Sequence, residues 1–270
     1  MLDVFNFPTP QQSNYQEFYG GGDTTGALPT RDWIKPRGAS MVRFMLIGAG
    51  GGGANSSSTA GAGGGGSGAV TSWIGPAIFI PDILQVAVGV GGKASDGIAS
   101  AIFYRASNGD NQILTAAGGS SALAGGAGGT AMTANYFTAS GIFTSIAGQA
   151  GAAVSSTASG TNVSASSTTF LSGGGGGAGG SAGTGGSVTP NYGYTALPVT
   201  TAGGSVAGAN GYFITQPILV GCGGAGGTTS TSVGSAGGNG GIGCGGGGAG
   251  EDAVSGGGRG GDGAVFIWAW

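Results

Sequence analysis

The chain has 270 residues, of which 69 are glycine and 9 are proline, and it carries a net charge of about −3 with no histidine. Hydrophobic residues make up 39% of the sequence and charged residues only 6%, which argues against disorder, because disordered chains are poor in apolar residues and rich in charge. The seven basic residues form no patch that could neutralise phosphates, so we expect no nucleic acid among the partners.

Residues 1–38 differ from the rest of the sequence and indicate an aromatic-rich N-terminal arm. Such an arm is ordered only where its rings dock on the body of the protein or on a partner. We expect Phe5, Phe7, Phe18 and Trp33 to anchor the protein to a larger assembly through this arm. The sequence starts without the layout of a signal peptide, and no apolar run approaches 18 residues, so we expect assembly in a cytoplasm and no membrane insertion.

The remainder, residues 39–270, is predicted to be one glycine-rich domain of the all-β class. Residues 41–47 and 263–270 are apolar and β-branched, as expected of strands with a buried face. Shorter candidate strands follow the same criteria: 78–80, 85–90, 101–104, 113–115 and 212–220. Because helical periodicity is nearly absent, we predict a small antiparallel β frame with almost no α-helix.

The glycine tracts follow a period of three. Residues 173–187 divide into GGG-GGA-GGS-AGT-GGS, and the tracts at 223–228, 237–248 and 257–263 keep the same period. Three residues per turn is the repeat of the polyproline-II geometry, which with glycine becomes a polyglycine-II helix. This helix has no internal hydrogen bonds, so its N–H and C=O groups must pair with neighbouring helices. We therefore predict a packed array of such helices, with third-position side chains on its outer faces and with 48–53 and 61–68 as turns after strands.

Two glycine motifs resemble nucleotide-binding loops. Gly48, Gly50 and Gly53 match G-x-G-x-x-G, but no helix pattern and no acidic residue follow at the required distance. Residues 89–95 resemble a phosphate loop but lack its first glycine and the hydroxyl residue after Lys93. We expect turns at both places and no cofactor.

Catalytic and metal-binding residue types are scarce. Without histidine, acid–base chemistry and zinc binding have few candidates, and the acidic residues are mostly isolated, so we expect no enzyme and no metal site. The alternative to having no metal site is a calcium site built from loop carboxylates such as Asp96 and Asp110. Cys222 and Cys244 are expected to be buried thiols, with a disulfide as the alternative.

Three segments carry a family resemblance: the strand running into Gly-Ala-Gly-Gly-Gly-Gly at 42–53, the stretch 87–92, and the closing Gly-Gly-Asp-Gly-Ala-Val-Phe-Ile-Trp at 260–268. Together they resemble the glycine-rich domain of bacteriophage fibre and tail proteins. The alternation of tracts and loops is similar to the distal tail-fibre adhesins of T-even-type phages. The resemblance covers about 40–270 and implies a sandwich of polyglycine-II helices whose tip loops grip a bacterial receptor.

The resemblance implies a receptor-binding adhesin on the virion surface, at the tip of a tail fibre or spike. Its partners would be other virion proteins, through the arm 1–38, and a bacterial glycan or outer-membrane protein. On that basis the receptor contacts are Tyr136, Phe137, Tyr192 and Tyr194. The oligomeric state is either a trimer or a single chain capping a trimer. The alternative function is a capsid decoration, head-spike or tail structural protein without a specific receptor.

Overall fold

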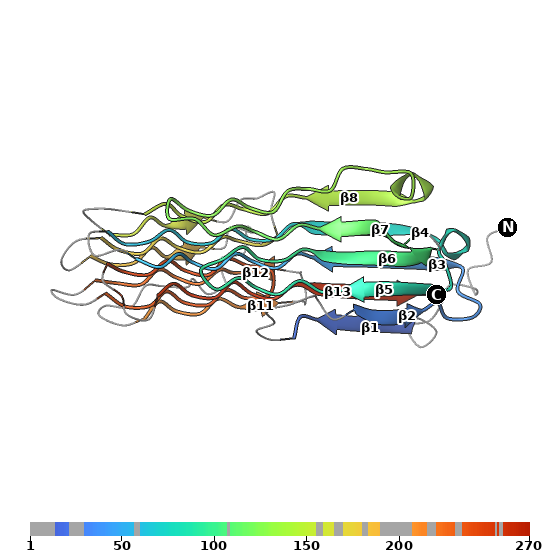
Figure 1. The fold of residues 1–270 in the computed structure, drawn as a ribbon, viewed down its shortest axis with the longest axis horizontal. Helices are drawn as coiled ribbons and strands as arrows, with labels where there is room; N and C mark the ends of the chain where they lie inside the picture. Colours follow the sequence, from blue (N-terminus) through green and yellow to red (C-terminus); the bar gives the residue numbers. More distant parts are fainter. Residues whose placement is uncertain are drawn as a thin grey trace.

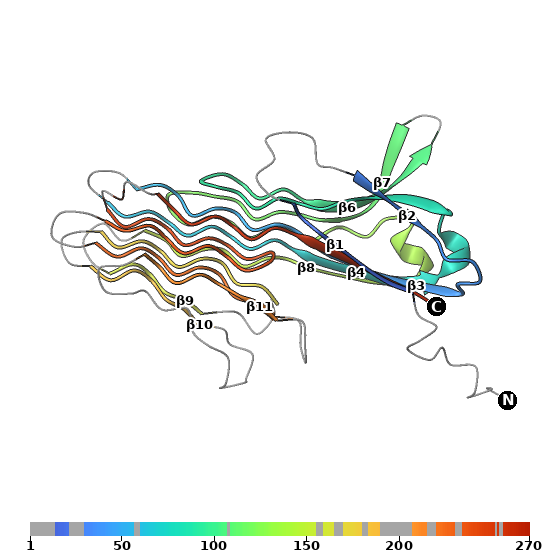
Figure 2. The same ribbon diagram turned by 90° about the horizontal axis from the view of Figure 1, so that it is seen from below.

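The molecule is elongated, with β-sheets at one end and glycine tracts running side by side toward the other (Figures 1 and 2). The computed structural model describes residues 14–21, 30–56, 60–106, 109–154, 159–164, 170–179, 183–189, 207–214, 220–229, 234–251, 253 and 256–270. Within these ranges no helix is both long and apolar enough to span a lipid bilayer.

Two antiparallel sheets form the β end of the molecule. The five-stranded sheet has the order β1 (Asn14–Tyr19), β13 (Ala264–Ala269), β3 (Met41–Ile47), β4 (Val70–Pro76) and β8 (Ile142–Ile146). The four-stranded sheet has the order β2 (Thr30–Ile34), β5 (Ile83–Ala87), β6 (Ser100–Ala106) and β7 (Gly109–Ala116). Two short 3₁₀ turns, η2 (Ala77–Phe79) and η3 (Thr138–Ser140), are the only helical elements of the described residues.

Two short strand pairs lie farther along the glycine tracts. Strand β9 (Val163–Ser164) pairs with β10 (Val188–Thr189) in parallel, and β11 (Phe213–Ile214) pairs with β12 (Val220–Gly221) antiparallel. The described residues are therefore nearly all β, with small and mostly antiparallel sheets, as the sequence predicted.

The two sheets enclose a side-chain core. Alternate residues of β3 point into it, so Val42, Phe44 and Leu46 are fully buried. A row of aromatic rings crosses this core: Trp33 of β2 packs edge-on against Phe44 at 5.7 Å, and Phe44 stacks on Trp73 of β4 at 5.9 Å. Burial of such large rings is the main stabilising contribution at this end of the molecule.

The arm predicted for residues 1–38 docks on the body where the structure describes it. Strand β1 pairs with β13 along its whole length, and β2 pairs with β5. Phe18 and Trp33 are buried in the core between the sheets. Phe5 and Phe7 lie outside the described residues.

The strand predictions hold best where apolar residues are continuous. Strands β3 and β13 are confirmed, and β5, β6 and β7 overlap the shorter candidates. The strand predicted at 78–80 is wrong, because the chain turns back after Pro76 in η2 and leaves Ile78 and Phe79 exposed. Of 212–220 only the two ends are strands, and 215–219 lie outside the described residues.

The segment 61–69 shows how the glycine tracts are held together. Its N–H groups donate to a different neighbour at each successive residue, and the sequence of neighbours repeats every three residues. Ala62, Gly65 and Gly68 donate to Ala249, Gly246 and Gly243, while Gly63, Gly66 and Ala69 donate to Leu123, Ser120 and Ala117. The third set, Gly64 and Ser67, donates to Ala152 and Gln149. This is the period of three that the triplets predicted; the polyglycine-II conformation itself stays a prediction.

The carbonyl groups of 61–69 bring the neighbours of this tract to six. They accept from three further segments, so the complete set is 243–249, 117–123, 149–152, 48–54, 126–129 and 174–177. The tract 243–251 is also bonded to six segments: 51–54, 62–68, 172–178, 224–227, 235–238 and 258–262. Six neighbours around one rod is hexagonal close packing. We call the hydrogen-bonded tracts from 48–54 to 256–263 the glycine lattice.

These bonds correct the prediction that 48–53 and 61–68 are turns after strands. Segment 61–69 is a central rod of the lattice, and 48–54 runs beside it, with Gly51 N–H donating to Gly66 C=O at 2.9 Å. The sequence could not distinguish a turn from a rod here, because both are rich in glycine.

Glycine is required in the lattice because the backbones approach so closely. A Cβ atom added at Gly65 would overlap the carbonyl of Gly51, and one added at Gly245 would overlap the carbonyl of Gly65. These neighbours are backbone atoms, which cannot rotate away as a flexible side chain can. These glycine positions therefore exclude any side chain, and the fully buried side chains elsewhere in the lattice tracts are small, as at Ala62, Ser67 and Cys244.

The tract predicted at 237–248 is two rods rather than one. Cys244 N–H donates to Gly241 C=O in a tight turn, and the chain then runs back beside itself, with Gly247 N–H donating to Gly238 C=O at 2.8 Å. Gly243 in this turn has φ +69°, a conformation that favours glycine. The tract 173–187 also reverses, because Gly186 N–H donates to Gly176 C=O at 2.8 Å.

Candidate functional site

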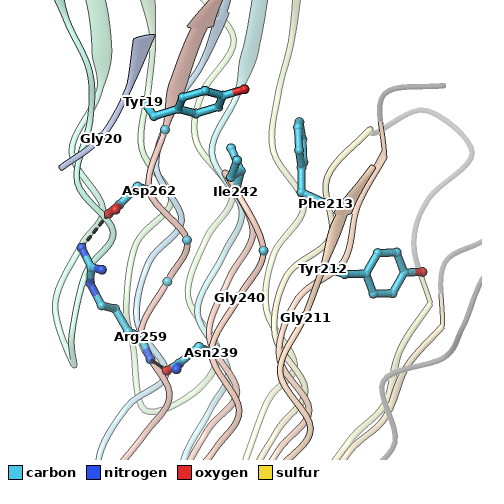
Figure 3. A pocket seen from close by; sticks show the side chains of 14 residues that line it. Tyr19, Gly20, Gly211, Tyr212, Phe213, Asn239, Gly240, Ile242, Arg259 and Asp262 are labelled. Carbon is cyan, nitrogen blue, oxygen red and sulfur yellow. Dashed lines mark hydrogen bonds and ion pairs between the residues drawn. The ribbon is translucent and has the colours of Figure 1, made fainter. Parts of the chain in front are cut away.

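A groove of about 540 Å³ lies where the five-stranded sheet meets the glycine lattice. Tyr19, at the end of β1, stands over three adjacent segments of the lattice surface, 211–213, 239–242 and 259–263 (Figure 3). Glycines of these segments form much of its lining, so the backbone itself is accessible to a ligand.

Four side chains of the groove come from third positions of the glycine triplets. The triplets GGN-GGI place Asn239 and Ile242 here, and GGR-GGD places Arg259 and Asp262 beside them. In each pair the residues are one period apart, so both side chains emerge on the same face of their rod. The sequence predicted third-position residues on the outer faces, but it gave no sign that these two rods are neighbours.

One wall of the groove is aromatic and apolar. Tyr19, Phe213 and Ile242 project on the side nearer the sheet (Figure 3). Tyr19 is held in place, because its ring packs edge-on against Phe266 at 6.0 Å and its hydroxyl donates to Glu17 Oε2 at 2.6 Å. Desolvation by burial, helped by the Glu17 carboxylate, raises the pKa of Tyr19 to about 12, so the phenol is neutral at physiological pH.

The opposite side of the groove is polar and also fixed. Arg259 Nη2 donates to Asp262 Oδ1 at 2.6 Å, and the same oxygen accepts the N–H of Gly91 at 2.8 Å. Asn239 Oδ1 accepts the N–H of Arg259 at 2.8 Å, and Asn210 Oδ1 accepts the N–H of Asn239 at 2.9 Å. These side chains cap outward-facing N–H groups of adjacent rods, which limits their own freedom.

Some backbone groups at the groove remain open. Within the described part of the chain, the N–H groups of Ile242 and Asp262 and the carbonyl of Gly240 have no hydrogen-bond partner. Ile242 and Asp262 lie three residues, one turn of the rod, after Asn239 and Arg259, so their N–H groups face outward in the same direction. The groove therefore offers two donors and an acceptor at fixed positions.

Tyr136 and Phe137, the nominated receptor contacts that the structure describes, do not line this groove. Tyr136 is fully exposed just before η3, at the sheet end of the molecule. Its neighbour Phe137 stacks on Trp73 at 4.7 Å and packs against the core. Tyr192 and Tyr194 lie outside the described residues. The sequence did not nominate Tyr19, Phe213, Arg259 or Asp262. The triplet period was the signal for Arg259 and Asp262, and no local pattern marked Tyr19 or Phe213.

The two nucleotide-loop motifs have their N–H groups occupied. Gly50 and Gly53 donate to Gly261 and Gly258, and the described residues that follow, 54–56 and 60–69, contain no helix. Gly91 donates to Asp262 and Gly92 donates to Gly50. These groups are part of the lattice and are not directed at a phosphate.

The other candidate groups are also engaged or buried. Asp96 Oδ1 accepts the N–H of Ser121 at 2.7 Å, and Asp110 pairs with Arg105. Among the residues that can be described, no three His, Cys, Asp or Glu side chains lie close enough to hold a metal ion. Cys222 and Cys244 are both buried free thiols, and burial raises the pKa of Cys244 well above its ordinary value.

Comparison with known proteins gives one match. The family model described as a glycine-rich domain matches residues 14–270. The matched range begins at β1 and therefore includes both β1 and β2 together with the lattice. No curated protein matches the sequence.

Proposed function

The chain belongs to the glycine-rich domain family, and from the resemblance of its tracts and loops to tail-fibre adhesins we propose that it is a non-enzymatic adhesin on a bacteriophage virion. In this proposal it sits at the tip of a tail fibre or spike and contacts the host surface through the groove beside Tyr19. Other virion proteins hold it in the particle.

The observation that carries this proposal is the convergence of side chains at the groove. The interior of the lattice holds only glycine and small side chains, yet larger side chains gather on one surface beside Tyr19: Asn239, Ile242, Arg259 and Asp262. Loops and surfaces on a rigid scaffold are where proteins place binding residues, because the scaffold fixes their geometry without further ordering on binding.

The placement of the chain ends is compatible with a mounted adhesin. Asn14 pairs with Ala269, so both ends of the domain lie at the sheet end, and the glycine lattice extends away from it (Figure 1). Attachment at the sheet end leaves the lattice and its groove accessible.

The test uses antibodies raised against the full chain. They should label the distal end of a fibre or spike in phage particles and should block adsorption to host cells. Labelling of the head or tail lattice, without any effect on adsorption, would contradict the adhesin and favour a decoration or structural protein without a receptor.

A further inference from the structure

We propose that the groove beside Tyr19 binds an uncharged sugar unit of a bacterial surface polysaccharide. This inference rests on the proposed adhesin function, because it names the ligand class of the same groove. The groove itself joins an aromatic wall to fixed hydrogen-bonding groups on a floor of bare backbone.

The size of the groove favours a small ligand. Its 540 Å³ falls within the range of about 300–1,000 Å³ found for small-molecule sites. A protein partner needs about 800 Å² of surface on each side. A recess between three rods holds one or two sugar rings more readily than the flat surface of a protein.

The aromatic wall suits one face of a sugar ring. A pyranose exposes a face of C–H groups, which packs against a flat aromatic ring and leaves its hydroxyls free at the edge. Tyr19 is 41% exposed and held by Phe266 and Glu17, so its ring is available without a loss of rotamer freedom.

The polar side suits sugar hydroxyls, each of which both donates and accepts. Asp262 is anchored through Oδ1, and Oδ2 has no partner among the described residues, so a rigid carboxylate oxygen can accept from a hydroxyl. The open N–H groups of Ile242 and Asp262 can donate to hydroxyl oxygens, and the Gly240 carbonyl can accept. A purely apolar ligand would bury these groups unpaired, at a cost in binding free energy.

The charge of the groove favours a neutral sugar over an acidic one. The one cation, Arg259, is paired with Asp262 at 2.6 Å, and the Glu17 carboxylate lies beside Tyr19. An anionic sugar or phosphate would meet the Asp262 carboxylate and a guanidinium already paired with it, with the Glu17 carboxylate nearby behind Tyr19, which is unfavourable.

The direct experiment measures binding of the full chain to immobilised bacterial O-polysaccharides and capsular polysaccharides. Saturation-transfer difference NMR against the bound polysaccharide then identifies the sugar protons that contact the protein. The two polysaccharide classes serve as separate arms, because either source could supply a neutral pyranose. We expect binding to at least one polysaccharide of neutral composition.

Three variants locate the site. Tyr19→Ala should weaken binding by about tenfold or more, which is the loss of one aromatic stacking contact, about 1.4 kcal/mol. Tyr19→Phe keeps the ring and its packing on Phe266, so it should retain most of the affinity. Tyr136→Ala is the matched control, because it removes a fully exposed tyrosine far from the groove and should change nothing. Thermal unfolding of each variant verifies that it is folded.

The outcomes separate the ligand class from the adhesin function. Binding to host cells that survives periodate oxidation of their glycans but not protease treatment would overturn the sugar proposal and leave the adhesin standing. If the chain binds no host cell, the adhesin fails, while the polysaccharide array still tests the groove. An equal loss of binding in Tyr19→Ala and Tyr136→Ala, or no loss in either, would exclude the groove as the site.

Discussion

In the β-sandwich, water is excluded by large side chains, whereas in the glycine lattice it is excluded by the backbone itself. Phe44, Leu46 and Trp73 fill the space between the sheets, and each is fully buried. In the lattice, segments such as 61–69 are surrounded by six others, and the buried side chains of this rod are only the methyl groups of Ala62 and Ala69 and the hydroxymethyl group of Ser67. A side-chain core depends on total volume and shape, but a backbone core depends on the absence of Cβ atoms.

The two regions are continuous with one another. Strands β3 and β13 pair in the sheet and then continue as the neighbouring tracts 48–54 and 256–263, where Gly50 N–H donates to Gly261 C=O at 2.8 Å. At the junction, Ile47 and Phe266 pack with Leu171 and Cys244 in a small apolar cluster. The sheet therefore sets the register in which the first rods enter the lattice.

The largest expected effect is that of one methyl group inside the lattice. Gly65→Ala should lower the free energy of unfolding by about 3 kcal/mol or more, because the new Cβ would overlap the Gly51 carbonyl and the rods must separate. Gly21→Ala is the matched control, since nothing lies within 4 Å of its added Cβ, and it should change stability by less than about 0.5 kcal/mol. Urea unfolding of both variants measures the difference; equal effects would break the comparison.

A volume-conserving change in the sandwich should be much milder. Leu46→Met replaces a fully buried side chain with one of similar volume, and such swaps cost less than about 1.5 kcal/mol in side-chain cores. The same urea experiment applies. A loss as large as that of Gly65→Ala would show that the sandwich is as intolerant as the lattice.

The edges of the lattice should depend on polar side chains. Asn239→Ala removes the oxygen that caps the N–H of Arg259, so we expect a loss of about 1 kcal/mol. The control is Asn14→Ala, because Asn14 is exposed and its side-chain oxygen accepts, among the described residues, only from nearby Gln16; its loss should cost less than about 0.5 kcal/mol. Thermal unfolding of the two variants compares them, and equal melting temperatures would exclude the capping role.

The smallest effect concerns the ionisation of Tyr19. Because its folded-state pKa of about 12 lies above the ordinary value of 10.0, its contribution to stability is complete below pH 10 and is lost as the pH rises toward 12. Glu17→Gln removes the carboxylate and should lower that pKa, but only in part, since desolvation is the larger cause. The ¹³Cζ NMR signal of Tyr19 in tyrosine-labelled protein, followed through an alkaline titration, measures the shift, with Asp110→Asn as the control. An unchanged Tyr19 titration would rule out the contribution of Glu17.

The sequence predicts which segments are strands and which are glycine rods better than it predicts which of them lie side by side. The apolar run 41–47 could only be a buried strand, and the triplets correctly required rods that bond to one another. Strands β4 and β8 were missed, because Thr71, Ser72, Gly75 and Pro76 break the apolar pattern of β4 and Thr144 and Ser145 that of β8. Their pairing is decided by β3 and by packing on the other sheet, which local sequence does not encode.

The groove could be predicted only in its parts. The third positions of the triplets indicate that four side chains face outward: Asn239, Ile242, Arg259 and Asp262. They do not indicate that 239–242 and 259–263 are adjacent rods. That adjacency depends on the turn at Gly241–Cys244, whose sequence is as rich in glycine as the rods that it connects. The sequence could not predict that Tyr19 belongs to the groove, because the position of Tyr19 follows from the long-range pairing of β1 with β13.

The direction of the lattice hydrogen bonds has a mechanical consequence. The bonds run across the rods, from one tract to the next, while the rods run along the long axis of the molecule (Figure 2). A pulling force along that axis therefore loads many bonds in shear at the same moment and cannot open them one by one, as it would if it peeled a single strand from an edge. Such a body transmits tension from one end to the other with little extension, even though its material is mostly glycine.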